Sequence, residues 1–165
     1  MIDFALPADA VAPQLLGCTL THAGVSIRLT EVEAYLGAED SAAHTFNGKT
    51  PRNAAMFGPP GRFYVYISYG IHRNVNIVCA PEGTGQGCLL RGGEIIEGAD
   101  TAFARRGTSD FHNLARGPGN LGKALGFTLE DNHQPIQIVE RTTEPEWVCG
   151  PRIGISKNKE AALRF

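Results

Sequence analysis

The chain has 165 residues, of which 42% are hydrophobic and 19% charged, and its formal net charge is −2 at pH 7. This length allows one domain with a real core, and this composition excludes a disordered chain. The apolar runs are too short to cross a bilayer, and the N-terminal residues lack the pattern of a signal peptide. We therefore expect no membrane partner and a protein that is not secreted, cytoplasmic in a bacterium or nuclear in a eukaryote.

The first third of the chain predicts a helix, a strand and a long loop. The segment PADAVAPQLLG is typical of a short helix capped at Gly17, although Pro13 interrupts it. Branched and aromatic residues predict a strand over residues 25–35. Residues 37–62 are rich in Gly, Pro, Asn and Asp, which predicts an ordered loop with one helical turn. Loops of this length inside compact domains are often functional.

The remainder predicts a hairpin followed by further strands and helices. Residues 63–67 and 74–79 are typical of two strands joined at a Tyr-Gly turn. A strand is predicted in GCLLRGGE, helices from Glu97 onward and in GNLGKALG, and final strands in QPIQIVER and PRIGIS. This order predicts an α+β fold, with an antiparallel sheet and helices around it.

Cysteine and histidine spacing predicts no metal site. The four cysteines, at 18, 79, 88 and 149, and the five histidines stand singly, and neither CxxC nor HxxxH occurs. We expect the cysteines to be reduced and packed. Although the net charge gives no general attraction to nucleic acid, residues 41–92 hold five basic residues and one acid, which permits a local positive surface.

The stretch EVEAYLGAEDSAAH, residues 31–44, combines carboxylates, a tyrosine and a histidine. Alternation along a strand places Glu31, Glu33 and Tyr35 on one face, and Val32 and Ala34 on the other. If the apolar face packs on the core, the polar face points into water or a cleft. For two glutamates alone, an ordinary solvated face is the commoner outcome.

All four tyrosines fall within 35 residues, at positions 35, 64, 66 and 69. We interpret Tyr64 as a core or cross-strand aromatic. Tyr69 stands beside Gly70 at the expected hairpin tip, where a large ring should not be left in water without a reason. A projecting hairpin that ends in an aromatic ring is what a wedge between base pairs needs.

Taken together, EVEAYLGAEDSAAH, TPRNAAMFGPPGRFYVYISYG followed by NVNI, CLLR, RGPGNLGKALG and PRIGI resemble the successive motifs of the alkyladenine (3-methyladenine) DNA glycosylase family. The resemblance is colinear from about residue 15 to residue 165. It implies a single glycosylase domain over residues 1–165, with a curved sheet and a protruding hairpin. It also implies a monomer that acts on double-stranded DNA without metal or cofactor. Such an enzyme flips a damaged purine (3-methyladenine, 7-methylguanine or hypoxanthine) out of the duplex and hydrolyses its N-glycosidic bond, leaving an abasic site.

The resemblance also implies roles for residues of the cluster. Glu33 would be the general base, near an oxocarbenium-like transition state. Tyr35 and His44 would stack on one face of the flipped base and Tyr66 on the other. Tyr69 would fill the gap left in the duplex. Glu33 and Tyr35 would then share a face because base activation and base stacking meet at one nucleotide.

Further positions match the family by the same resemblance. The Asn76 amide would crowd the 2-amino group of normal guanine. Arg91 would hold the phosphate beside the flipped nucleotide and help to fix the water, which the carbonyl of Ile153 would also bind. Possible phosphate contacts are Arg52, Arg73, Arg116 and Lys123. Ile71 stands where some relatives carry methionine, and the glycines after Arg91 also depart from the family pattern.

Other readings of the same residues stay open. No lysine lies inside the catalytic motifs, which favours simple hydrolysis over a Schiff base. One alternative is a protein that recognises distorted DNA without turnover. Another is an unrelated hydrolase that uses Glu33 and His44 as its acid–base pair. Intact Glu33, Arg91 and Asn76 argue against the first, and Tyr69 argues against the second, which would have no use for an aromatic hairpin tip.

Overall fold

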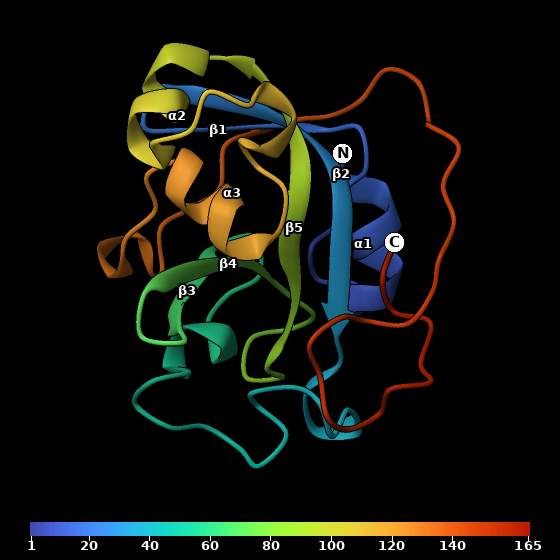
Figure 1. Ribbon diagram of the computed structural model, residues 1–165. Coiled ribbons are helices and arrows are strands. Elements are labelled where there is room, and N and C mark those ends of the chain that lie inside the picture. The colour runs from blue at the N-terminus through green and yellow to red at the C-terminus, as the bar shows by residue number, and fades with distance from the viewer.

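The structure, a computed structural model that describes residues 1–165, is built on one curved six-stranded antiparallel sheet with the order β3-β4-β5-β2-β1-β6 (Figure 1). The strands are β1 (Thr19–His22), β2 (Val25–Tyr35), β3 (Phe63–Ser68), β4 (His72–Cys79), β5 (Gln86–Glu97) and β6 (Ile138–Val139). The helices are α1 (Ala8–Leu15), α2 (Ala99–Arg106) and α3 (Pro118–Ala124). The predicted α+β class is confirmed. No helix is long and apolar enough to span a membrane.

One hydrophobic core joins the sheet to its helices. Helix α1 packs on β2 and β5, and α3 packs on β4 and β5 (Figure 1). Two glycines of α3 permit its close approach to the hairpin. A Cβ on Gly119 would meet the His72 ring at 2.7 Å, and one on Gly122 would lie 1.9 Å from the carbonyl oxygen of Arg73. The RGPGNLGKALG segment therefore fixes α3 against the base of the hairpin.

Strand β2 changes its core-facing side halfway along. Ile27 and Leu29 are buried in its first half, and Val32 and Ala34 in its second half. The register with β5 shifts between these two pairs, so that Thr30 has no partner in β5. This β-bulge adds one residue and inverts the alternation. The polar residues of the EVEAY segment therefore lie on the face opposite the core.

Several sequence predictions are confirmed with adjusted ends. The strand over residues 25–35, the hairpin, and helices α1, α2 and α3 all form. The loop after β2 contains two short 3₁₀ turns, Gly37–Glu39 and Ala54–Phe57, where one helical turn was expected. Strand β1 was not predicted, and QPIQIVER gives only the two residues of β6.

The predicted strand in PRIGIS is wrong, because residues 151–156 form irregular structure. Their polar groups are used elsewhere: the Ile153 N–H donates to the Glu33 carboxylate, and the Arg152 side chain is buried. The last three residues instead pair with β2, where Val32 and Phe165 exchange backbone hydrogen bonds of 2.9 and 2.8 Å. This pairing brings the C-terminal segment against the second half of β2 (Figure 1).

The cysteine prediction is correct for three positions. Cys18, Cys79 and Cys88 are buried as free thiols, but Cys149 is exposed. Cys149 follows Val148, another exposed residue, in a segment without regular secondary structure. The expectation that the cysteines are packed is therefore wrong for Cys149.

Candidate active site

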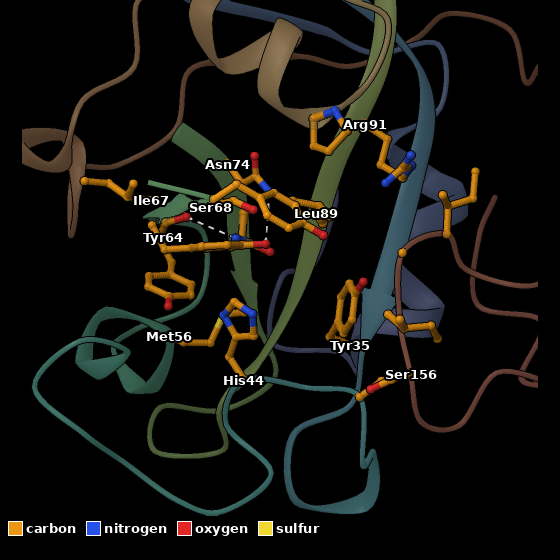
Figure 2. Close-up of a pocket in the computed structure, with 18 of the residues that line it drawn as sticks. Tyr35, His44, Met56, Tyr64, Ile67, Ser68, Asn74, Leu89, Arg91 and Ser156 are labelled. Carbon is orange, nitrogen blue, oxygen red and sulfur yellow. Dashed lines mark hydrogen bonds between the residues drawn. The ribbon is translucent and has the colours of Figure 1, made fainter. Parts of the chain in front are cut away.

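A cavity of about 580 Å³ opens beside the C-terminal end of β2 (Figure 2). It is lined from β2, the loop over residues 37–62, the β3–β4 hairpin, β5 and the C-terminal segment. All four tyrosines of the chain line it. The other predicted site residues that line it are His44, Arg52, Asn76, Arg91 and Ile153. The curved sheet thus gathers most of the predicted site around one hollow.

Glu33 lies directly behind this lining and is 0% exposed. Its Oε1 accepts a hydrogen bond of 2.9 Å from the Tyr35 hydroxyl, and its Oε2 accepts one of 2.7 Å from the Ile153 N–H. The Arg91 guanidinium lies 3.7 Å from Oε1. The expectation that this carboxylate points into water or a cleft is therefore wrong: the C-terminal segment covers it, and only its three partners reach the cavity. Burial and the neighbouring carboxylate raise the pKa of Tyr35, which keeps this phenol a hydrogen-bond donor.

Glu31 has a different environment, although it shares the strand face. Its side chain is 33% exposed, and its Oε1 lies 3.0 Å from Arg91 Nε and 3.4 Å from Arg164 Nη1. Arg91 thus bridges the two glutamates of β2 from the neighbouring strand. Because the Arg91 side chain is only 12% exposed, it is held in place between them.

The aromatic walls of the cavity are arranged differently from the expected grouping. His44 and Tyr66 contact each other, with ring centroids 4.4 Å apart and an interplanar angle of 68°. A base stacked between two rings needs them about 7 Å apart, twice the usual contact distance. His44 and Tyr66 therefore belong to one wall, and Tyr35 stands apart on the β2 side (Figure 2). This contact differs from the expected grouping, in which Tyr35 and His44 share one face of the base and Tyr66 takes the other.

Burial determines the protonation states of the His44 and Tyr66 side chains. It lowers the pKa of His44, with a smaller contribution in the same direction from Arg52, so the imidazole is neutral at pH 7. Burial also raises the pKa of Tyr66, and Asn74 Nδ2 donates to its hydroxyl at 3.1 Å. Both rings are thus uncharged stacking surfaces.

Two hairpin residues that line the cavity, Tyr64 and Asn76, are almost completely buried. Asn76 Nδ2 donates to the carbonyl oxygen of Tyr64 at 3.3 Å, which fixes the amide. Tyr64 is buried, as predicted for a core aromatic, yet it also lines the cavity, and its hydroxyl has no hydrogen-bond partner. The close-up shows Tyr64 and Met56 on the same side of the cavity as His44 (Figure 2).

The hairpin tip projects two apolar side chains into solvent. Tyr69 is 89% exposed, and its backbone adopts a left-handed conformation with φ of +50°. Ile71 is exposed beside it. The predicted place of Tyr69 at the hairpin tip is confirmed, and its ring also lines the cavity.

The four basic residues predicted to contact phosphates are all exposed but do not form one cluster. Arg52 lines the cavity and donates to the carbonyl oxygen of Ile67 at 2.8 Å. Arg73 and Lys123 line a separate hollow of about 520 Å³ beside the hairpin. Arg116 lines neither hollow, and its backbone forms an isolated bridge to Gly92.

Sequence reasoning missed several residues of this region. Met56, Asn74, Leu89 and Lys157 also line the cavity, and Asp40 and Arg152 form a buried ion pair behind it. Asp40 and Arg152 do lie within two of the motifs, EVEAYLGAED and PRIGI. Nothing in the sequence indicated that these two residues are buried, because an acid and an arginine in loops are typical of a solvated surface.

Comparison with known proteins identifies the family of this chain. Residues 2–165 match the family described as methylpurine-DNA glycosylase (MPG). A protein of Corynebacterium efficiens named "Putative 3-methyladenine DNA glycosylase" is 68% identical over 169 residues, which cover 99% of this chain and 89% of that protein. A protein of the same name from Corynebacterium glutamicum is 65% identical, and the match covers 99% of this chain and 90% of that protein. Another from Cutibacterium acnes is 49% identical, and the match covers 100% of this chain and 93% of that protein. A match over nearly the whole chain establishes membership, and the chain belongs to the methylpurine-DNA glycosylase family of DNA repair enzymes that act on alkylated purines.

Proposed function

We propose that this chain excises alkylated and deaminated purines, of the 3-methyladenine, 7-methylguanine and hypoxanthine type, from double-stranded DNA. Glu33 is the general base, water is the nucleophile, and the product is an abasic site. The observation that carries the proposal is a fully buried carboxylate whose three partners, Tyr35, Arg91 and Ile153, all line an aromatic cavity. The 3-methyladenine in the names of the relatives supports the same substrate class.

The chemistry follows from the surroundings of Glu33. Departure of a purine leaves positive charge on the sugar, and a carboxylate in a site shielded from water stabilises that charge strongly. Each carboxylate oxygen accepts one hydrogen bond from the protein and retains capacity for another, so Glu33 can also accept a proton from water. Arg91 and the carbonyl of Ile153 are the groups that we assign to hold this water. The Ile153 N–H fixes the carboxylate itself.

The base lies between Tyr35 on one side and the His44–Tyr66 pair on the other. A neutral imidazole and two phenol rings offer π faces to an electron-poor or positively charged purine. Asn76, whose amide is fixed by the Tyr64 carbonyl, is positioned to crowd the 2-amino group of normal guanine. This arrangement selects damaged purines by shape and charge.

The exposed hairpin tip brings the enzyme to the duplex. Extruding a base requires a few kcal/mol, less for a poorly paired base, and a side chain that fills the gap lowers this requirement. We assign that role to Tyr69. Arg52, Arg73, Arg116 and Lys123 then contact phosphates and set the register of a monomer on double-stranded DNA.

The test is a single-turnover reaction on a labelled duplex that contains hypoxanthine or 7-methylguanine. We expect a free base and an abasic site that breaks only after alkali, with no protein–DNA adduct on borohydride treatment. Because Lys157 lines the cavity, an adduct would point to this amine and refute simple hydrolysis. Lesion-specific binding without release would make the protein a recognition factor, and absence of duplex binding would exclude both DNA functions.

A further inference from the structure

An ion pair that no solvent reaches lies behind the Tyr35 ring. Arg152 Nη1 and Nη2 lie 2.6 and 2.8 Å from the two carboxylate oxygens of Asp40, and both side chains are 0% exposed. The Arg152 guanidinium carbon lies over the Tyr35 ring, 4.6 Å from its centroid. Tyr35 lines the cavity and Arg152 does not, so the guanidinium covers the side of the ring that faces away from the cavity.

The pair also ties together three segments that build the cavity. Arg152 Nη1 donates to the carbonyl oxygen of Ala34 at the end of β2, at 3.0 Å. Asp40 accepts hydrogen bonds of 3.0 Å from the Leu36 N–H and from Asn158 Nδ2. Asp40 belongs to the loop that carries His44, and Arg152 directly precedes Ile153. One buried contact thus fixes the position of the Tyr35 ring, the histidine loop and the amide that binds Glu33.

The charge of the pair affects which bases can stack on Tyr35. A base on the cavity side of the ring lies one stacking distance of about 3.5 Å further out, about 8 Å from the guanidinium carbon. Two unit charges at that separation, in an effective dielectric constant of about 20, repel by an energy equivalent to about thirtyfold in binding. The Asp40 carboxylate, bound to the guanidinium through both of its oxygens, offsets this repulsion. A neutral base such as hypoxanthine would not experience it.

From this geometry we infer that Asp40 and Arg152 are positioning residues for base recognition. Arg152 holds Tyr35 from behind, and Asp40 neutralises the cation so that a positively charged alkylpurine can stack on the other side of the ring. The inference rests on the proposed function. It adds a reason for the cavity to accept cationic bases: the charge of Arg152 behind the cavity wall is balanced by the charge of Asp40.

The test compares two substrates with one enzyme preparation. In Asp40→Asn the guanidinium loses its counter-charge, so kcat/KM for 7-methylguanine should fall at least fivefold relative to kcat/KM for hypoxanthine. The ratio of the two values cancels any loss of folded protein, because both scale with the same active fraction. The matched control is Asp131→Asn, which removes the carboxylate from the 2.9 Å contact between Asp131 and the His22 ring, away from the cavity. Its ratio should stay within twofold of the wild-type ratio.

A second variant separates charge from positioning. Asp40→Asn/Arg152→Gln leaves no charge behind Tyr35, so the substrate ratio should return to within twofold of wild type. Both rates should remain at least fivefold lower, because the flat guanidinium no longer supports the ring.

An unchanged ratio in Asp40→Asn, or an equal shift in Asp131→Asn, would overturn the charge argument. Wild-type rates in the double variant would overturn the positioning role, which this variant tests even if Asp40→Asn does not fold. Wild-type enzyme that releases neither base would instead refute the proposed function itself.

Discussion

Replacing Asp40 with asparagine should reveal how much stability one buried carboxylate provides. Burial by itself would raise the pKa of this carboxyl, but hydrogen bonds from Arg152, Asn158 and the Leu36 amide outweigh burial and lower the pKa from 3.8 to about 2. That difference corresponds to about 2 kcal/mol of folding free energy at pH 7. The substitution also leaves Arg152 as an unpaired buried cation, and breaking such a pair typically destabilises a protein by about 3–5 kcal/mol. We expect a loss of about 3 kcal/mol at neutral pH.

The pH dependence of this loss has a definite sign. A carboxyl whose pKa is lower in the folded chain stabilises the fold above its unfolded pKa, and this contribution disappears as the pH falls towards the folded value. The gap between wild type and Asp40→Asn should therefore be constant from pH 7 to about 5. About half of the 2 kcal/mol should be gone at about pH 3, midway between the two pKa values.

Urea unfolding followed by tryptophan fluorescence measures this gap directly. Trp147 is the only tryptophan of the chain, and its ring packs edge-on against Phe165 at 5.7 Å, next to the pairing of Phe165 with β2. Asp131→Asn, in a more exposed pair with His22, should lose no more than about 1 kcal/mol. A gap below about 1 kcal/mol for Asp40→Asn at pH 7, or a gap that stays constant from pH 5 to 3, would refute the reasoning.

Three further substitutions test separate parts of the structure. Tyr69→Ser should weaken binding to a lesion duplex at least tenfold, as measured by fluorescence anisotropy. Because Tyr69 is exposed, the free energy of unfolding of the protein should change by less than about 0.5 kcal/mol. Unchanged affinity would contradict the role of Tyr69 as a wedge. Gly122→Ala should lower the midpoint temperature of unfolding by several degrees, because its Cβ would meet the Arg73 carbonyl oxygen at 1.9 Å. Gly150→Ala is the control and should not lower it, because a Cβ there has nothing within 4 Å. Equal effects of the two substitutions would contradict the close packing of α3. Arg91→Lys should slow base release at least tenfold, because one ammonium cannot bridge both glutamates. A release rate within twofold of wild type would contradict that role.

Local patterns were sufficient to predict the elements that position the site. The branched and aromatic residues of 25–35 and the Tyr-Gly turn predicted β2 and the hairpin, because strand propensity and turn chemistry are properties of neighbouring residues. The bulge at Thr30 was not predictable in this way. It depends on how β5 pairs with β2, and it places Glu33 and Tyr35 opposite the core.

Long-range contacts account for what sequence reasoning missed. Glu33 is buried because the Ile153 amide, 120 residues away, folds over it. Asp40 and Arg152 are 112 residues apart and form a pair that neither motif indicates alone. PRIGIS resembles a strand by alternation, yet its backbone serves the site, so no neighbouring strand pairs with it. The His44–Tyr66 contact likewise depends on the path of a long loop.

The most direct test of the central claim compares Glu33→Gln with Glu31→Gln in single-turnover release of hypoxanthine from a labelled duplex. Both substitutions remove one carboxylate from the same face of β2, and only Glu33 is fully buried behind the cavity. Loss of a general base typically slows a reaction by about a hundredfold to ten-thousandfold. We predict a loss of that size for Glu33→Gln, less than tenfold for Glu31→Gln, and lesion binding retained in both. Release by Glu33→Gln at the wild-type rate, or equal losses in the two variants, would contradict the assignment of Glu33 as the base.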